Sequence, residues 1–234
     1  GSLRTGDRLK ANVDPARRRT TVLHHSSAHI FHAAVRERLG KQVTQAGSQV
    51  GPQAMRFDFS FERQPTREEL LDIEAMMNQW VRENSPVTTD IMSLEEAKKT
   101  GAIAMFGEKY GDSVRVVRMG DFSLEFCGGT HVGTTGEVGL IKIVSEGSIS
   151  SGVRRVEAYS GERAWEHIQS QIQYLAQATE KLKVRPSELA SQIEKLQEQL
   201  KAKDKEFEAL EQKIALSKIG DLISSSENIG NTRL

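Results

Sequence analysis

This sequence has little of several features that would define its class at once. Cysteine occurs once in 234 residues, which excludes an internal disulfide framework and favours a reducing, cytoplasmic setting. There is no signal peptide pattern at the start, and no apolar run approaches the ~20 residues that a membrane-spanning helix needs. An excess of charge of one sign is also missing, because 32 Lys and Arg balance 32 Asp and Glu. Composition therefore predicts no membrane association and no strong general affinity for nucleic acid.

Residues 1–20 are polar and basic and are predicted to be a linker from a preceding domain. The opening Gly1-Ser2 is typical of a cleaved expression tag, so we expect an excised fragment. "TGDRLKANVD" is interpreted as a short strand leaving that preceding domain, and "ARRR" as either a solvated linker or a contact to phosphate.

Residues 21–160 mix helical and strand patterns, which predicts an α+β domain containing an antiparallel sheet. Thr66 with Glu69, and Ser93 with Glu96, form two capping-box patterns that mark helix starts. Alternating apolar and polar residues mark the strands. The predicted helices are 21–39, 66–84 and 93–101, and the predicted strands are 56–61, 113–120, 121–126, 139–149 and 153–161.

After Gly161 the pattern becomes helical, and residues 161–220 are predicted to form a long helical hairpin or a coiled coil. A helix over 162–182 is interrupted by "VRPSE" and followed by a 4-3-4-3 apolar spacing over nearly four heptads. A hairpin turning at Pro186 and self-association through residues 187–216 both remain open. Residues 221–234 are predicted to be a flexible tail. The heptad positions are Leu189, Ile193, Leu196, Leu200, Lys203, Phe207, Leu210 and Ile214.

The only cysteine, Cys127, lies in "CGGTH", with His131 four positions later. Upstream, His25 and His29 are separated by one helical turn, so both rings can reach one ion. Histidine nitrogens and a thiolate are the ligands that Zn²⁺ prefers in a tetrahedral site. The pattern therefore predicts a His₃Cys zinc site, provided that the fold brings the two pairs together.

Other interpretations of the same residues remain. A histidine pair can form a polar helix face, and a lone cysteine is often a small buried apolar side chain. Cys127 could be a nucleophile with His131 as its base, but this leaves the histidine spacing unexplained. A zincin protease is excluded, because Ser26 follows His25 where that motif needs glutamate. His24 and His32 receive no assigned role.

Three stretches together resemble the editing domain of alanyl-tRNA synthetase. They are "HHSSAHIFHAAVRERLGKQVTQAGSQV", "MRFDFS" and "FSLEFCGGTHVGTTGEVGLIKIVSEGSISSGVRRVEAYSG". The resemblance runs from about Arg17 to Gly161 and continues into the helical region that follows editing in that enzyme. Free-standing deacylases share the pattern, and the editing domain of threonyl-tRNA synthetase shares it in part. The aminoacylation domain, which binds ATP in the parent enzyme, is expected to be absent from this chain.

The resemblance implies an aminoacyl-tRNA deacylase. Its substrate would be the 3′ end of tRNA(Ala) wrongly charged with serine or glycine. A pocket for alanine discriminates poorly against such close analogues, since these differences are worth only about 1–3 kcal/mol. A second site that hydrolyses the errors is the physical remedy, and we expect it to contain a polar group that alanine leaves unpaired.

The resemblance also implies individual roles. His25, His29, Cys127 and His131 match the zinc-binding positions of the family, and Gln45 matches a polar position of the editing pocket and is the candidate catalytic residue. The further candidates for substrate binding are Thr44, Ser48, Gly152, Arg154 and Arg155. Two departures are "QAGS" in place of "QKGS" and Phe61 where a histidine is common; the first removes a charge that could contact tRNA.

The sequence is compatible with two mechanisms and with two further functions. Zinc could lose or expand a ligand and activate water, or it could order the pocket while Gln45 and backbone groups hold the attacking water. The alternatives to synthetase editing are a free-standing trans-editing deacylase and a non-catalytic, zinc-stabilised tRNA-binding module.

Overall fold

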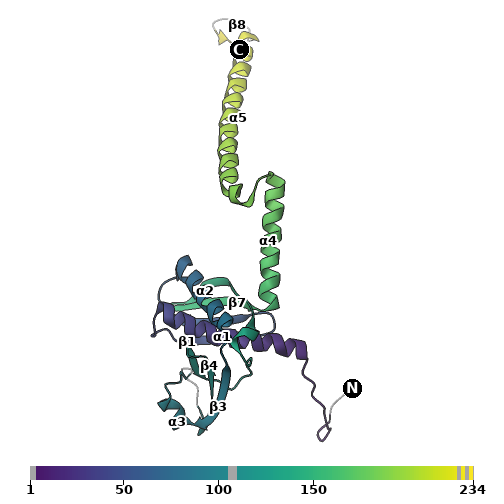
Figure 1. Ribbon diagram of the computed structural model, residues 1–234. Coiled ribbons are helices and arrows are strands. Elements are labelled where there is room, and N and C mark those ends of the chain that lie inside the picture. Colours follow the sequence, from purple (N-terminus) through teal and green to yellow (C-terminus); the bar gives the residue numbers. More distant parts are fainter. Residues whose placement is uncertain (1–3, 105–109, 226–227, 230–231, 234) are drawn as a thin grey trace. The chain divides into compact units, whose positions relative to one another are not determined.

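The computed structural model describes residues 4–104, 110–225, 228–229 and 232–233 (Figure 1). The chain divides into two compact units, Gly1–Gln169 and Ser170–Leu234. Each unit is described by itself. The first unit combines helices with two antiparallel sheets, so the predicted α+β class is confirmed.

Helix α1 spans Pro15–Leu39, and the prediction that this helix starts at residue 21 was wrong. Asp14 caps the helix, because its side chain accepts hydrogen bonds from the backbone N–H groups of Ala16 and Arg17. Pro15 at the first helical position has a backbone angle already suited to a helix. "ARRR" therefore lies in the first turns of α1 rather than in a linker, and "TGDRLKANVD" forms no strand within the described residues 4–14.

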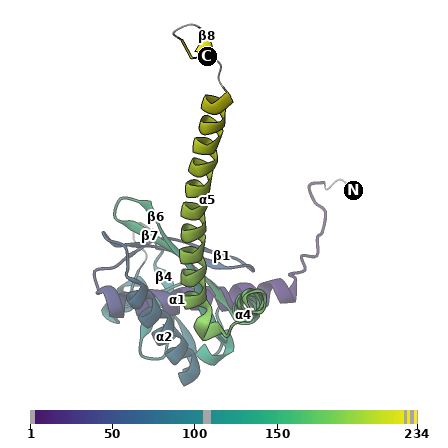
Figure 2. The same cartoon turned by 90° about the horizontal axis from the view of Figure 1, so that it is seen from above.

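The larger sheet has the order β1-β2-β7-β6, with every neighbouring pair antiparallel. Helix α1 packs against β1, β2 and β7, and helix α2 (Arg67–Glu83) lies beside α1 (Figure 2). Strand β1 was not predicted, since its residues lack a regular alternation of apolar and polar side chains. The strands are β1 Gln45–Val50, β2 Met55–Ser60, β6 Ile141–Ser150 and β7 Val153–Ser160.

The smaller sheet has the order β3-β4-β5 and is also antiparallel. The strands predicted over 113–120 and 121–126 are observed as β4 (Ser113–Met119) and β5 (Ser123–Phe126). Strand β3 (Val87–Ser93) was not predicted, because most of its residues are exposed and polar. The short helix α3 (Leu94–Lys99) follows β3. Both predicted capping boxes, at the starts of α2 and α3, are confirmed.

The main core lies between α1, α2 and the larger sheet. Phe31 of α1 packs edge-on against Phe57 and Phe59 of β2, and all three side chains are buried. Ile73 and Met77 of α2 are fully buried in the same cluster. This packing sets the position of the middle of α1, which carries most of the histidines.

The helical part of the chain comprises α4 (Glu162–Leu182), the 3-10 turn η2 (Pro186–Glu188) and α5 (Leu189–Ser225). The predicted helix over 162–182 and its interruption are confirmed, and the last helix runs further than predicted. The hairpin alternative is not seen in the described residues, because α4 does not pack along α5 and the large apolar side chains of α5 are exposed. The tail expected to be flexible contains the end of α5 and a short pair, β8 (Asn228–Ile229) with β9 (Thr232–Arg233); its other residues fall outside the described part. Among the described residues, no helix is long and apolar enough to cross a membrane.

Candidate metal centre and adjoining cavity

Two segments that are about 100 residues apart in the sequence meet in the first unit. The middle of α1 presents His25 and His29, and the loop that follows β5 presents Cys127 and His131. One nitrogen of each histidine and the Cys127 sulfur all lie within 4.8 Å of one another. Two pairs of residues that are far apart in the sequence therefore form one group of four potential ligands.

The cysteine sulfur lies close to two of the rings. Cys127 Sγ is 3.3 Å from His131 Nε2 and 3.4 Å from His25 Nε2. The ring centroids of His25 and His131 are 4.3 Å apart, and that of His29 is 4.8 Å from His131. Ligand atoms around a tetrahedral zinc ion lie roughly 3.3–3.6 Å apart, which is close to the two distances from Cys127 Sγ. The more distant pairs would have to move closer together to bind one ion.

Two neighbouring side chains orient the histidines. Glu125 Oε2 accepts a hydrogen bond from His29 Nδ1 at 2.8 Å, and Ser26 Oγ lies 3.3 Å from His131 Nδ1. With Nδ1 engaged, each ring has Nε2 left for a metal. A carboxylate or hydroxyl behind a ligating histidine fixes its tautomer and ring orientation, and this arrangement is common in zinc proteins.

The electrostatics of the group favour an anionic cysteine. Burial alone would raise the pKa of the Cys127 thiol, but hydrogen bonds from the three histidines lower it to about 3. Burial would likewise raise the pKa of Glu125, but His29 and His32 hold it well below its usual range. Burial lowers the pKa of His131. A thiolate beside histidine nitrogens is a donor set that fits Zn²⁺.

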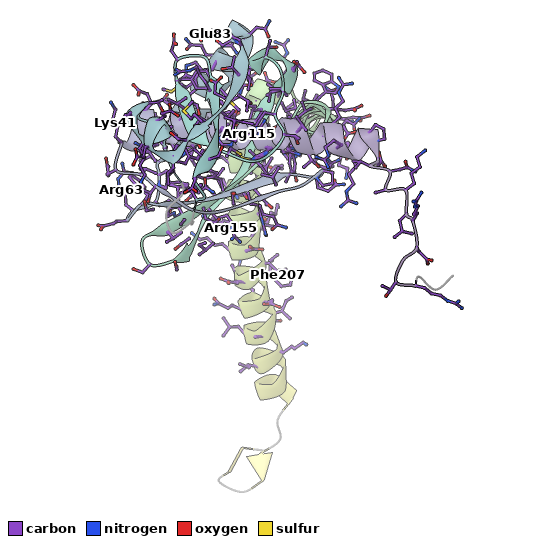
Figure 3. All side chains as sticks on the ribbon, turned by 90° about the horizontal axis from the view of Figure 1, so that it is seen from below. Lys41, Arg63, Glu83, Arg115, Arg155 and Phe207 are labelled. Atoms are coloured by element: carbon purple, nitrogen blue, oxygen red, sulfur yellow. The ribbon has the colours of Figure 1, made fainter. Side chains whose placement is uncertain are left out.

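The metal loop depends on one glycine and one arginine. A side chain at Gly129 would overlap the His25 ring, whereas Gly128 has no neighbour within 4 Å of such a position. Arg115 of β4 is labelled in Figure 3. It donates hydrogen bonds to the carbonyl oxygens of Cys127 and Gly129 and to the Thr89 hydroxyl. The loop is thus anchored to β3 and β4 through Arg115, and its two potential ligands, Cys127 and His131, face α1.

A small cavity of about 130 Å³ adjoins the group. Glu125 belongs to both, because it binds His29 and also lines the cavity. The candidate residues Thr44 and Gln45 line it as well; the Thr44 hydroxyl lies 2.9 Å from Ser60 Oγ, and the Gln45 amide donates to Ser48 Oγ at 3.0 Å. The lining residues are His32, Arg36, Thr44, Gln45, Ile103, Ala104 and Glu125.

The remaining candidates for substrate binding do not line this cavity. Ser48 is exposed and contacts Gln45, and Gly152 lies in the turn between β6 and β7 with a φ of +71°. Arg154 pairs with Glu146 at 2.5 Å, and Arg155 makes two hydrogen bonds to Asp58. Both guanidinium groups therefore have a carboxylate partner, and their contact with phosphate stays a prediction.

Sequence reasoning missed Glu125, Arg36 and Arg115 and left His32 unassigned. Glu125 lies two residues before Cys127 on a strand, which is the one local signal that it could share the site. His24 has a structural role: Nδ1 lies 2.8 Å from the Gly51 carbonyl oxygen, and Nε2 accepts from the backbone of Ser160. A larger hollow of about 920 Å³ around the start of α1 contains none of the four potential ligands among its lining residues.

Comparison with known proteins gives two results. Residues 114–157 match the family model described as the threonyl and alanyl tRNA synthetase second additional domain. The whole 234 residues align at 47% identity with alanine–tRNA ligase of Methylobacillus flagellatus, and 229 residues, 98% of the chain, at 45% with that of Haemophilus influenzae PittGG. Alanine–tRNA ligase of Idiomarina loihiensis is 45% identical over 232 residues.

The chain spans about a quarter of the length of these relatives, namely 26% of the Haemophilus protein and 27% of the other two. The resemblance to alanyl-tRNA synthetase seen in the motifs is thereby confirmed along nearly the entire chain. The aligned part of the chain includes both the unit that holds the four potential ligands and the helical region after it.

Proposed function

We propose that this chain, which aligns with alanine–tRNA ligases along nearly its whole length, is the part of such a synthetase that removes wrong amino acids from tRNA. The reaction is hydrolysis of the ester between serine or glycine and the 3′-terminal adenosine of tRNA(Ala). Water adds to the ester carbonyl, the bond to the ribose oxygen breaks, and the free amino acid and uncharged tRNA leave. We place the reaction in the cytoplasm, as the single cysteine favours.

One observation carries the proposal. The four potential metal ligands and the cavity lined by Thr44 and Gln45 are joined through a single side chain, Glu125. A reactive ester needs mainly correct positioning of water and carbonyl, and a small cavity that carries polar side chains can provide this positioning. The similarity to alanine–tRNA ligases supports tRNA as the carrier of that ester.

We propose that His25, His29, Cys127 and His131 hold Zn²⁺. A bound Zn²⁺ would supply a positive charge beside the cavity and would link α1 to the loop after β5. With four protein ligands it would have no free position for water, so we assign the handling of water to this chain's own polar groups. Gln45 is the candidate to hold the attacking water, with Thr44 beside it, and Ser48 keeps the Gln45 amide in place.

The phosphate-binding part of the proposal rests on Gly152, Arg154 and Arg155. All three lie in or beside the β6–β7 hairpin, where tRNA backbone could approach the exposed turn. Because both arginines have carboxylate partners, we expect them to add little to affinity. We also propose self-association through residues 187–216, since the apolar positions of α5 lie along one seam.

The decisive experiment compares release of serine from Ser-tRNA(Ala) with release of alanine from Ala-tRNA(Ala). We expect the serine ester to be hydrolysed selectively. Cys127→Ala should abolish zinc binding and reduce the rate by at least about 100-fold, because it removes a ligand. Gln45→Ala should reduce the rate while zinc stays bound, and Gln49→Ala, an exposed position on the same strand, is the matched control.

Other results would point to other functions. Zinc binding and tRNA binding without hydrolysis of either ester would favour the non-catalytic tRNA-binding module. Hydrolysis that survives Cys127→Ala with a folded chain would contradict a metal-dependent site. Equal hydrolysis of both esters would contradict an editing role.

A further inference from the structure

One buried polar atom of the first unit has no role in the site as described so far. His32 is only 3% exposed, and its Nδ1 lies 3.2 Å from Glu125 Oε1. Its other ring nitrogen, Nε2, is buried and has no hydrogen-bond partner among the described residues. Burying a polar atom without a partner costs free energy, so native proteins rarely leave one in this state unless something else binds there.

The position of His32 shows where such a partner would come from. The residue lies on α1 one turn after His29, and the His32 ring lines the 130 Å³ cavity together with Thr44 and Gln45. The volume corresponds to roughly four water molecules at ~30 Å³ each, which suits a small polar group rather than a large side chain. A guest in this cavity would lie beside the His32 ring.

Hydrogen bonding determines what Nε2 can recognise. Glu125 holds the Nδ1 side of the His32 ring, so Nε2 is the ring nitrogen left for a guest. A hydroxyl can both donate and accept a hydrogen bond, so it suits Nε2 whether or not that atom carries a proton. The Ser123 hydroxyl also donates to Glu125 Oε1, at 3.1 Å, so the carboxylate is held firmly in this arrangement. The ring is further fixed by contact with Phe57, at 5.3 Å between centroids.

An aminoacyl ester offers three groups to Nε2. The ester carbonyl can only accept a hydrogen bond, and the ammonium group can only donate one. The ammonium would also bring a charge to a cavity that the Arg36 cation lines, where both oxygens of Glu125 already accept hydrogen bonds. A side-chain hydroxyl is neutral and can do either. Among serine, glycine and alanine, only serine has one.

Resting on the proposed editing function, we propose that His32 is a specificity-determining residue whose Nε2 forms a hydrogen bond with the hydroxyl of the serine ester. Glu125 positions it by holding Nδ1, and thereby connects the selection of the amino acid to the metal ligand His29. An alanine ester would place a methyl group against Nε2 and leave it unpaired. The site would thus disfavour the correct product, which is what an editing pocket requires.

A pair of substitutions separates this role from structural support. His32→Asn keeps an amide nitrogen where Nδ1 donates to Glu125 but removes the atom at Nε2. We expect kcat/KM for Ser-tRNA(Ala) to fall about tenfold, the value of one hydrogen bond, while that for Gly-tRNA(Ala) changes less than about threefold. His32→Gln carries a polar atom further out, near Nε2, and should retain most of the serine-to-glycine ratio. Zinc content should be unchanged in both.

Equal losses on both esters with His32→Asn would overturn the inference, since they would show that His32 only supports Glu125 or the core. An unchanged serine-to-glycine ratio would overturn it as well.

A measurement on the unsubstituted chain keeps the test valid if His32→Asn does not fold. The probes are the non-hydrolysable amides 3′-seryl-amino-3′-deoxyadenosine and its alanyl counterpart, observed by ¹⁵N NMR of the histidine rings. We expect the His32 Nε2 resonance to shift with the seryl amide only, and the seryl amide to bind more tightly. Equal binding of both amides without that shift would overturn the inference.

The same measurement distinguishes failure of this inference from failure of the proposed function. If the chain hydrolyses neither ester but binds the seryl amide selectively through Nε2, hydrolysis by this chain is contradicted and the role of His32 stands. If it hydrolyses the serine ester selectively but His32 Nε2 does not respond, the proposed function stands and another residue reads the hydroxyl.

Discussion

At the scale of single residues, the candidate metal centre depends on the small size of Gly129 as much as on the four potential ligands. Four potential ligand atoms lie within 4.8 Å of one another only because the loop backbone at Gly129 passes directly beside the His25 ring. The loop is tied to β4 through Arg115, so it has little freedom to move away. The close approach explains why the two glycines of "CGGTH" are not equivalent.

We predict that Gly129→Ala weakens zinc binding at least tenfold, because the new methyl group must displace the His25 ring from its ligating position. Gly128→Ala is the matched control and should bind zinc as the original chain does, since its methyl group points into open space. Competition with a chromophoric zinc chelator measures both affinities. Equal affinities for the two variants would contradict the arrangement of loop and ring described above.

Glu125 is the charged residue that connects the potential metal ligands with the cavity. Its carboxylate accepts hydrogen bonds from His29, His32 and Ser123 and so uses both oxygens. One residue therefore fixes the tautomer of a potential metal ligand and that of the ring that lines the cavity. This is the physical basis for treating metal centre and cavity as one site.

At the scale of elements, helix α2 illustrates how local sequence determines a helix start. The Thr66 hydroxyl accepts from the Glu69 backbone at 3.1 Å, and the Glu69 carboxylate accepts from the Thr66 backbone at 2.8 Å. Arg63 adds two hydrogen bonds to the same carboxylate. The bonds from Arg63, and then that from the Thr66 backbone, lower the pKa of Glu69 from 4.5 to about 2.

We predict that Glu69→Gln lowers the free energy of unfolding by about 1 kcal/mol at pH 7, because glutamine keeps the capping-box geometry but removes the negative charge that pairs with Arg63 and lies at the helix N-terminus. The folded-state pKa of Glu69 is depressed, so its contribution is complete above the unfolded value near 4.5 and is lost as pH falls from 4.5 towards 2. Urea unfolding at a series of pH values measures this difference.

The control for that measurement is Glu68→Gln, an exposed position in the same turn, which should change stability by only a few tenths of a kcal/mol. A Glu69→Gln difference that stays constant from pH 7 to pH 2 would show that the carboxylate charge does not stabilise the helix start.

At the scale of the whole molecule, the division at Gln169 separates the site from the long helix. All four potential ligands and every residue that lines the small cavity lie in Gly1–Gln169. In the second unit, α5 exposes a row of large apolar side chains, among them Leu200 at 63% and Phe207 at 62% exposure. Apolar side chains repeated at this spacing are usually covered by another helix.

We predict that the full chain self-associates through α5, whereas a chain ending at Gln169 stays monomeric and still binds zinc. Leu200→Glu should abolish the association, because it places a charge on the seam, and Lys201→Glu, at the next position outside the heptad seam, is the control. Sedimentation at several concentrations measures the mass. A full chain that remains monomeric at every concentration would contradict self-association through α5.

Much of the fold follows from patterns that act over a few residues. The capping boxes of α2 and α3, the alternation in β2 and β7, and the break at Pro186 all reflect contacts between near neighbours in sequence, so they could be predicted. The start of α1 also had a local signal, Asp14-Pro15, which the basic run after it obscured. Strands β1 and β3 had weak signals because their burial depends on partners elsewhere in the chain.

The sequence likewise established the two halves of the candidate metal centre, since HxxxH on a helix and CGGTH in a loop are local patterns. Their approach to one another is a property of the packed structure, because only the packing of α1 beside β5 brings together residues about 100 positions apart. The joining of both halves to a cavity depends on Glu125 and His32, which are 93 positions apart. Hydrogen bonds over such separations form only once the intervening chain has folded. The spacing of residues along the sequence therefore does not predict them.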